Sequence, residues 1–450
     1  MEVTEAAERL GVARTTLSRV EQQQPKAAKA RRLEIPEDRG VFRLPSLTER
    51  LTLYAALTAL TSLSIDALLP ALRQIGAALA PSPILSTQHL VSLFILGMAI
   101  GELAIGPLSD AWGRKRALLI GLAVYGVGTV LAGLAGSLEL MVLGRILQGV
   151  GVAGPKIATR AMIRDQFAGD QMARILSFMF TLFILVPMLA PILAQGLTRL
   201  AGWRSLFLAY LVVATGLGLW LSLRHPETLS PAARIPIRPS LLIANGRRIL
   251  SHRQVVLLIV ATGLVFSAQL LYLSIAADLF FDLYDIETGF PLLFAVLALS
   301  LGLASFVNAG WVRWVGAAWI ARRALLGLST AGLTLVAASA AFDGRPPLWL
   351  FLVIGLAGFF AIGLLFGNLN ALAMRPLGRL AGFGASVIAS GSSLIASCLA
   401  VGIGALYDGS ATALALGFIL AGMGGLGLFE AALRSEATEI DPIGSADHRR

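Results

Sequence analysis

Charged residues are scarce in this sequence of 450 residues. Asp, Glu, Lys and Arg make up 14% of it, against roughly 25% in a soluble domain, whereas hydrophobic residues make up 56%. The mean hydropathy is +0.79, and apolar stretches of about 20 residues recur along most of the chain, each long enough to cross a bilayer as a helix. The alternating ten-residue pattern that is typical of outer-membrane barrels is absent. These features predict an all-α membrane protein.

Groups that support metal, redox or nucleotide chemistry are also few. A single cysteine, Cys398, excludes a disulfide framework and a thiolate metal cluster. The sequence contains no phosphate-binding loop of the Walker form, so ATP is not expected to drive this chain directly. Its four histidines are widely scattered: His89, His225, His252 and His448. We therefore expect no catalytic residue, no metal site and no cofactor, and the protein is not expected to be an enzyme.

Apolar windows of about 19 residues predict twelve transmembrane helices in two sets of six. The predicted helices span residues 51–73, 86–109, 117–136, 139–164, 175–199, 203–223, 254–281, 288–311, 324–342, 347–374, 381–407 and 411–433. Two fused repeats produce this six-plus-six pattern, so we expect two pseudo-symmetric six-helix bundles. The predicted organisation is an N-terminal tail 1–50, a bundle 51–223, a linker 224–253, a second bundle 254–433 and a C-terminal tail 434–450.

The distribution of basic residues predicts the orientation of the chain. If the N-terminus is cytoplasmic, four of the 36 Lys and Arg residues lie outside, three lie within predicted helix 4, and all the others lie on the cytoplasmic side. Cytoplasmic loops are enriched in Lys and Arg, so both termini are predicted to be cytoplasmic. The net charge of +10 then reflects topology and does not indicate binding to nucleic acid. We expect a multi-pass monomer in the lipid bilayer of a bacterial inner membrane.

The N-terminal tail, residues 1–50, lacks the apolar core of a signal peptide. Its segment 4–20 resembles a helix-turn-helix unit. Such a unit needs at least a third helix to bury its apolar face, and the residues that follow are Gln-rich and basic. We therefore favour a cytoplasmic tail, or the product of an upstream start codon, over a DNA-binding unit.

The predicted loop between helices 2 and 3 carries the most specific motif. The segment 106–116, GPLSDAWGRKR, resembles the signature of the major facilitator superfamily in this loop. An ordinary basic cytoplasmic loop explains the run of cations at the end of this segment. It does not explain why Gly106, Asp110 and Gly113 stand at the spacing of the signature. Glycine permits a tight turn and close helix contact, and Asp110 is placed to accept the free N–H groups of a facing helix.

The resemblance implies a cluster that closes the cytoplasmic side of the outward-facing state. Arg114 is expected to pair with Asp165 at the end of predicted helix 4. The corresponding loop of the second half, residues 310–316, has no acid at the equivalent place, so we expect the first half to build most of the latch. The residues expected to take part in gating are Gly106, Asp110, Gly113, Arg114, Asp165 and, in predicted helix 5, Pro191.

Predicted helix 4 contains three basic residues, Arg145, Lys156 and Arg160. Ionisable side chains within a membrane span are costly and are candidates for function. At 100° per residue, Arg145 and Lys156 lie about 20° apart on one face and about 16 Å apart along the axis. We expect this cationic face to line a wet cavity or to face a carboxylate.

The carboxylates available to that face are Asp66 in predicted helix 1 and Glu102 in predicted helix 2. Either could take up and release a proton as its surroundings change, which proton coupling requires. The alternative for each is a static ion pair that fastens two helices together. Asp66 and Glu102 are therefore the candidates for proton coupling.

Four segments of the first half resemble a narrower branch, the drug:proton antiporters of the bicyclomycin-resistance (Bcr/CflA) type. They are residues 64–72, 143–151, 159–165 and 202–207. The resemblance implies that Arg145 takes part in proton transfer and that Asp66 is an acid of the cavity.

Two helices of the first half depart from the antiporter pattern. In predicted helix 5 Pro191 is kept, but Ala190, Ala194 and Gln195 replace glycines of the antiporter motif. Small residues four apart still allow close helix contact, and proline permits a bend. Lys156 is the second departure. If it faces the cavity beside Arg145, the two cations suit an anionic or zwitterionic solute.

Polar and aromatic residues of the second half complete the expected substrate site. Asn368 and Asn370 could bind a solute by hydrogen bonds, or could simply join helices. Gln269 and Tyr272 are candidates for the cavity wall, although aromatic residues of membrane helices more often pack or face lipid. With Lys156, these four residues form the expected binding site for a small-molecule substrate.

Three functions remain open at this point. The first is a secondary active transporter that exports drugs or other small organic solutes in exchange for protons, by alternating access. The second is a proton-coupled importer of a small solute such as a siderophore or a peptide. The third is a membrane-tethered regulator that uses residues 1–50.

Overall fold

The computed structural model describes residues 45–440 except 80–81, 83–84 and 168. The segment 4–20, with its resemblance to a helix-turn-helix unit, and residues 441–450 lie outside the described residues. The regular structure described is helical throughout, which confirms the all-α prediction. Within the described residues eleven helices are long and apolar enough to cross a membrane. The predicted helix 175–199 corresponds to α8, whose described apolar part is Leu185–Ala201.

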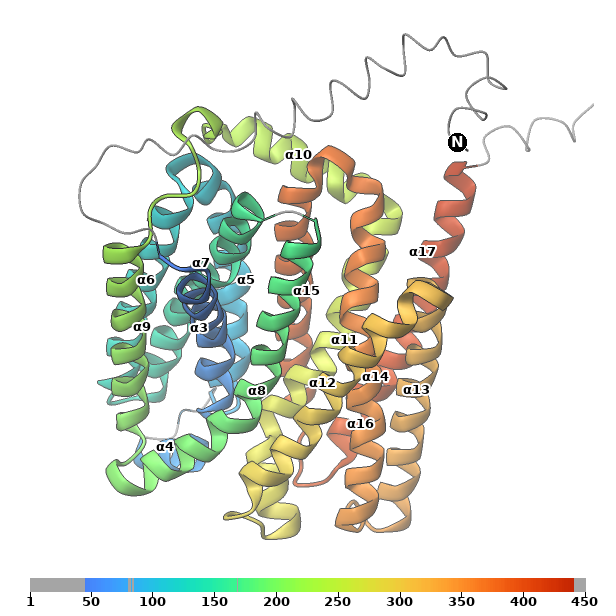
Figure 1. Ribbon diagram of the computed structural model, residues 1–450. Helices are drawn as coiled ribbons and strands as arrows, with labels where there is room; N and C mark the ends of the chain where they lie inside the picture. Colours follow the sequence, from blue (N-terminus) through green and yellow to red (C-terminus); the bar gives the residue numbers. More distant parts are fainter. Residues whose placement is uncertain (1–44, 80–81, 83–84, 168, 441–450) are drawn as a thin grey trace, which may run out of the picture. The chain divides into compact units, whose positions relative to one another are not determined.

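Two groups of long helices follow one another along the chain (Figure 1). The first group contains α3 (Leu47–Asp66), α4 (Leu72–Ala78), α5 (His89–Trp112), α6 (Arg114–Gly133), α7 (Leu138–Gln166), α8 (Gly169–Ala201) and α9 (Arg204–Arg224). The second contains α11 (Arg253–Asp278), α12 (Phe290–Val315), α13 (Ala317–Ala341), α14 (Leu348–Met374), α15 (Ala381–Gly404), α16 (Thr412–Ile419) and α17 (Gly425–Ile440). The described residues belong to one compact unit.

Helix ends differ from the predictions where the backbone changes its hydrogen-bond pattern. The first helix continues beyond Asp66 through a 3₁₀ turn, Leu69–Ala71, and α4. Pro70 in that turn has no N–H to donate, which favours a break in the α-helical ladder. The last predicted helix contains a π turn, Leu420–Gly424, between α16 and α17. α8 contains Pro187 and Pro191 and changes direction along its length (Figure 1), as expected where proline removes backbone hydrogen bonds.

One helix lies within the predicted linker. α10 (Pro239–Ser251) begins with proline, which is favoured at the first position of a helix because its missing N–H has no helical partner there. It lies at the end of the helix bundle where α9 ends and α11 begins (Figure 1). This end is called the α10 end below, and the other is called the opposite end.

Glycines bring α5 and α7 into backbone contact. A Cβ atom at Gly97 would lie 2.1 Å from the carbonyl oxygen of Ile146, and one at Gly149 would lie 2.0 Å from that of Phe94. Neither position therefore accepts a side chain without movement of a helix. This contact fixes which residues of α5 and α7 face each other.

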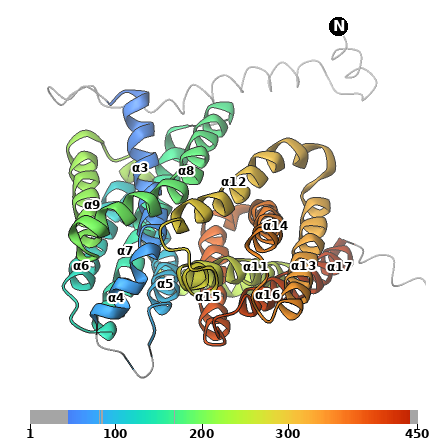
Figure 2. The same ribbon diagram turned by 90° about the horizontal axis from the view of Figure 1, so that it is seen from below.

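The two groups of helices meet through a few of their members. α5 packs beside α15 and α11, and α8 packs beside α12. Figure 2 shows the two groups side by side, with α5 next to α15 and α8 next to α12 where they meet. Most contacts between the two halves therefore come from α5, α8, α11, α12 and α15, and α4 adds a smaller contact with α11.

Candidate functional site

Arg145 on α7 is fully buried and surrounded by acceptors. Its Nε donates to the carbonyl oxygen of Leu90 at 3.1 Å, and Nη2 donates to that of Ser64 at 3.1 Å. Nη1 donates to the side-chain oxygen of Gln148. The guanidinium carbon lies 4.3 Å from the ring centre of Phe94, a cation–π contact.

These contacts extend into a network that joins four helices. Gln148 donates to Thr129 on α6 at 2.8 Å, and the hydroxyls of Ser64 on α3 and Tyr125 on α6 are 2.7 Å apart. The cationic face of predicted helix 4 was expected to line a wet cavity or to face a carboxylate. Lys156 of that face does meet a carboxylate, that of Glu102. Arg145 has no carboxylate within ion-pair distance among the described residues, and main-chain carbonyls, an amide and an aromatic ring surround its charge.

Glu102 on α5 forms a buried ion pair with Lys156 on α7. The Lys156 Nζ lies 2.5 Å from Oε1 of Glu102, and the side chain of Glu102 is 0% exposed whereas that of Lys156 is 22% exposed. Apart from Lys156, no donor among the described residues reaches either carboxylate oxygen of Glu102. Arg160, one turn further along α7, also attracts Glu102 electrostatically. The expected pair of free cations, Lys156 and Arg145, is therefore not present, because Glu102 neutralises Lys156.

Asp66 lies buried at the end of α3. The hydroxyls of Tyr210 on α9 and Tyr272 on α11 lie within the range of electrostatic interaction with Asp66. Both hydroxyls are buried and have no hydrogen-bond partner among the described residues. Because Tyr272 belongs to the second half, Asp66 is an acid of the first half that interacts with a polar group of the second.

The candidates of the second half lie in different surroundings. Tyr272 packs against Phe359 and Phe294, with ring centres 4.7 and 5.8 Å away. Asn368 on α14 is buried and donates to the side-chain oxygen of Asn308 on α12 at 2.6 Å. This contact joins two helices, which is the alternative that the sequence had left open.

Two further candidates are only half-buried. Asn370 donates to the carbonyl of Phe366, one turn earlier in α14, at 2.9 Å. Gln269 lies on α11, half-buried, three residues before Tyr272.

A polar cluster surrounds Arg114 at the α10 end. Its Nε donates to Asp165 on α7 at 2.9 Å, which is the predicted pair. Its Nη1 donates to Ser109 at 3.1 Å and also to Asp110. Arg114 is almost fully buried, so these partners hold the ends of α5, α6 and α7 together through charge-assisted hydrogen bonds.

Glu227 completes this cluster, and the sequence analysis did not identify it. Its carboxylate accepts from the backbone N–H groups of Arg114 at 2.9 Å and Lys115 at 3.1 Å, and so caps the N-terminus of α6. Asp110 was expected to cap a facing helix. In the structure its carboxylate instead pairs with the Arg114 side chain, one turn away. The sequence offered one hint of this role. Glu227 is an acid that directly follows Pro226, close to the end of the sixth predicted helix.

The glycines of the motif make room for these contacts. Gly113 has a φ of 105°, a conformation that disfavours other residues, and a Cβ there would lie 2.3 Å from Glu227 Oε2. A Cβ at Gly106 would lie 2.8 Å from the hydroxyl of Ser386 on α15. Gly106 therefore allows α5 to approach the second half closely.

At the opposite end, polar side chains bridge the two halves. Arg73 on α4 pairs with Asp282 and, at 3.3 Å, with Glu287. Gln88 donates to Asp278 at 3.1 Å, and Gln195 on α8 donates to the carbonyl of Glu287 at 2.9 Å. Deeper in the bundle, the hydroxyls of Ser92 on α5 and Ser274 on α11 are 2.9 Å apart.

The two ends thus differ in which helices their ion pairs connect. Those of the opposite end join the first half to the second, whereas those around Arg114 join helices of the first half to one another and to the segment after α9. The ion pairs of the described residues therefore link the two halves at the opposite end, and link elements of the first half to one another around Arg114.

Comparison with known proteins identifies relatives of this chain. The family described as Major Facilitator Superfamily matches residues 54–401. The bicyclomycin resistance protein homolog of Haemophilus influenzae is 26% identical over 336 residues, which cover 74% of this chain and 83% of the relative. The multidrug resistance protein MdtL of Escherichia fergusonii is 28% identical over 360 residues, which cover 78% of this chain and 88% of the relative.

Solved structures with the same fold include transporters of different solutes. The D-xylose–proton symporter has a TM-score of 0.67 at 16% identity, with 87% of this chain and 97% of the other covered. The human organic anion transporter MFSD10 has a TM-score of 0.62 at 15% identity, with 87% and 99% covered. At these identities the likeness concerns the fold alone.

Proposed function

Because this chain belongs to the Major Facilitator Superfamily, and is therefore a multi-pass membrane transporter and not an enzyme, we propose that it exports small organic solutes in exchange for protons. The relatives named for resistance to bicyclomycin and to multiple drugs support export. We place the protein in the bacterial inner membrane as a monomer, with the α10 end and both termini in the cytoplasm, in accord with the basic residues of that side.

The observation that carries proton coupling is the ion pair of Glu102 with Lys156. Glu102 is fully buried, but its partner is 22% exposed, so the pair can be reached from one side. A buried carboxylate that accepts no hydrogen bond is costly to keep charged once its cation is drawn away. A proton or the cationic group of a solute can each replace Lys156 as the partner of Glu102.

Competition between a proton and a solute for Glu102 would exchange one for the other across the membrane. In this scheme a solute with a cationic group binds the carboxylate only after the proton has left, and a proton taken up from outside releases the solute. Asp66, which interacts electrostatically with Tyr272 of the second half, is the second proposed proton site. Arg145 holds α3, α5, α6 and α7 in register around both acids.

The same ion pair supports one alternative, a proton-coupled importer. If protonation of Glu102 only frees Lys156, then Lys156 gains the ability to bind an anionic solute together with the proton. The two schemes have opposite linkage: in exchange, solute binding releases a proton, whereas in cotransport it takes one up.

Flux in proteoliposomes across a panel of cationic, zwitterionic and anionic solutes tests the proposal. We expect counterflow that depends on the proton gradient, and loss of that dependence in Glu102→Gln and Asp66→Asn. Asp343→Asn is the matched control, since Asp343 is exposed outside the membrane helices and has a φ of 49° that asparagine tolerates. Flux that ignores the gradient in the unmodified protein would refute proton coupling. Proton release or uptake on solute binding then distinguishes export from import.

A further inference from the structure

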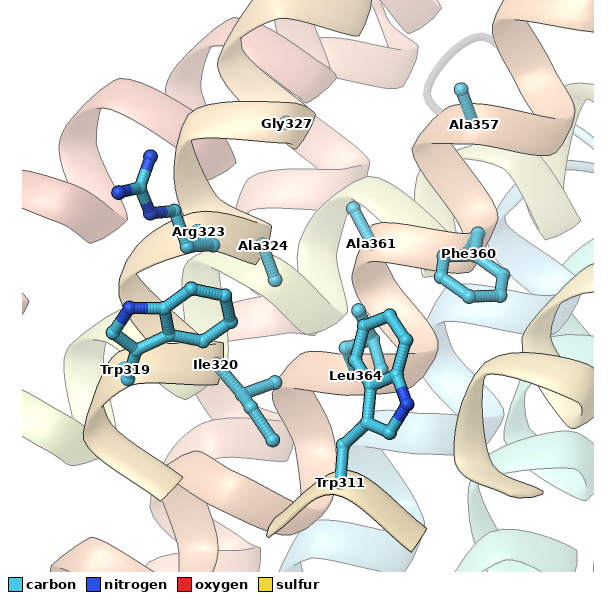
Figure 3. A pocket seen from close by; sticks show the side chains of 10 residues that line it. All are labelled: Trp311, Trp319, Ile320, Arg323, Ala324, Gly327, Ala357, Phe360, Ala361 and Leu364. Atoms are coloured by element: carbon cyan, nitrogen blue, oxygen red, sulfur yellow. The ribbon is translucent and has the colours of Figure 1, made fainter. Parts of the chain in front are cut away.

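A groove opens between α12, α13 and α14 in the second half, away from the charged residues described above (Figure 3). Its volume is about 360 Å³, which is within the range of small-molecule sites. Its lining residues are Trp311, Trp319, Ile320, Arg323, Ala324, Gly327, Ala357, Phe360, Ala361 and Leu364.

The groove exists because small residues face one another between large ones. Ala324 and Gly327 on α13 lie opposite Ala361 on α14, while Trp311 on α12 and Trp319 on α13 stand at its mouth (Figure 3). Trp311 is 54% exposed and Trp319 is 47% exposed. In a membrane protein such exposed aromatic side chains face lipid at the level of the headgroups.

Two arginines of the helices that form this mouth have no carboxylate partner among the described residues. Arg323 lines the groove one turn along α13 from Trp319, and Arg313 lies two residues after Trp311 on α12. The guanidinium of Arg323 lies 5.5 Å from the ring centre of Trp319, and that of Arg313 lies 5.6 Å from that of Trp314. The neighbouring Arg322 differs, because it pairs with Glu430 on α17 at 2.5 Å. Over the described residues no ion pair occupies Arg313 or Arg323, so both are available to an anion from outside the chain.

We propose that this groove binds one anionic phospholipid of the leaflet at the α10 end. The acyl chain fills the apolar groove between Trp311, Phe360 and Leu364. The phosphate lies at the rim, where Arg323 and Arg313 donate charge-assisted hydrogen bonds. A basic, aromatic-lined pocket between membrane helices provides the chemistry that anionic headgroups need. An ordinary aromatic belt at the membrane surface would explain the exposed tryptophans. It would not explain the groove or the two arginines that have no carboxylate partner.

The proposal is independent of the transported solute and of proton coupling. It requires only that these helices cross a bilayer, as the family membership states. A lipid in the groove would connect α12 to α13 and α14 and would stabilise the second half during transport.

Quenching of tryptophan fluorescence by brominated lipid tests the site in the whole protein. The protein is placed in phosphatidylcholine vesicles that contain a small fraction of brominated phosphatidylglycerol, and compared with vesicles that contain brominated phosphatidylcholine instead. We expect quenching by the anionic lipid to exceed that by the zwitterionic lipid. Replacement of both arginines, Arg313→Gln with Arg323→Gln, should lower this preference about thirtyfold, since each cation near an anionic surface contributes about 1 kcal/mol. Arg375→Gln, an exposed arginine near the same membrane surface but outside the groove, should leave it unchanged.

A second variant tests the apolar part of the groove. A side chain at Gly327 would meet nothing within 4 Å, so Gly327→Leu should fold and should exclude the acyl chain, which lowers quenching by the anionic lipid severalfold. Gly402→Leu, at an exposed position of α15 where a Cβ likewise meets nothing within 4 Å, is its control. Equal quenching by the two lipids, or quenching that both groove variants leave intact, would overturn the proposal. So would burial of Trp311 and Trp319 between two copies of the chain, detected as a dimer in native mass spectrometry.

Discussion

Glu102 on α5 and Lys156 on α7 meet where glycines bring their two helices into backbone contact. Gly97 and Gly149 allow the two backbones to touch, and Gly101 would place a Cβ 2.4 Å from the carbonyl oxygen of Val150. At that separation a lysine of α7 reaches the carboxylate of α5 at 2.5 Å. The backbone contact between α5 and α7 therefore determines that these two residues pair.

The first prediction separates the structural role of this pair from its role in transport. Lys156→Ala leaves the buried carboxylate of Glu102 without its cation, which should lower the free energy of unfolding by about 3 kcal/mol or more. The double variant Lys156→Met with Glu102→Gln should recover most of that loss, because no buried charge remains unpaired. Thermal unfolding in detergent measures both.

The double variant should nevertheless transport without regard to the proton gradient. Lys156→Arg is its companion: it keeps the cation and should keep both stability and gradient dependence, with altered solute preference. If the double variant still couples flux to the gradient, the assignment of Glu102 is wrong.

The second prediction concerns Gly113 and Glu227. Gly113→Ala places a methyl group on the carboxylate of Glu227 and forces a strained backbone, which should cost about 1–3 kcal/mol of stability. Gly136→Ala, where a Cβ meets nothing within 4 Å, should change stability little. Glu227→Gln keeps an acceptor but loses the charge, so we expect a smaller loss of about 1 kcal/mol. Thermal unfolding ranks the three variants, and equal effects of the two alanine variants would contradict this account.

Helix geometry explains why part of this site was predictable from the sequence. A fixed rotation of 100° per residue put Arg145 and Lys156 on one face of α7, and both side chains do contact α5, at Leu90 and Glu102 respectively. The pairing of Arg114 with Asp165 was likewise predictable from a motif.

Other features depend on contacts that leave no pattern in the sequence. Arg145 is surrounded largely by backbone carbonyls, which every residue possesses, so its partners could not be named in advance. Glu227 and Gly113 are far apart in the chain, and neither periodicity nor hydropathy connects them. The search for apolar windows did not predict α10. A short surface helix needs only one apolar stripe, so its mean hydropathy does not exceed that of a linker.

The third prediction tests the bridge at the opposite end. Arg73→Gln removes both cross-half ion pairs, to Asp282 and Glu287, and should favour the conformation open at that end. Ser92→Cys in a Cys398→Ser background reports this opening, because Ser92 is buried against Ser274. Exposed ion pairs contribute up to about 1 kcal/mol, so labelling by an impermeant maleimide should be about fivefold faster.

Arg345→Gln supplies the control for this measurement. Arg345 lies on the same side, exposed, and its side chain takes part in no ion pair of the described residues. Labelling that is unaffected by Arg73→Gln, or equally accelerated by Arg345→Gln, would show that the bridge does not hold this end closed.

The fourth prediction is a pH dependence of stability that originates at His225, which follows α9 and lies outside the membrane helices. Burial lowers the pKa of His225 below its ordinary value of 6.5, an effect that nearby Glu49 opposes and that Arg50, Lys115 and Arg224 reinforce. The side chain is 2% exposed, and its Nε2 lacks a hydrogen-bond partner among the described residues.

The sign of the effect follows from proton binding. Just below pH 6.5 the unfolded chain binds a proton at His225 that the folded protein excludes, so stability should fall as the pH drops from 6.5 towards the lowered pKa. His225→Phe keeps a ring against Tyr54, 5.8 Å away between ring centres, and cannot titrate. The apparent Tm of the unmodified protein, measured above and below pH 6.5, should therefore decrease more on acidification than that of His225→Phe. His252→Phe is the control and should retain the dependence of the unmodified protein; if it abolishes the dependence while His225→Phe does not, a different group is responsible.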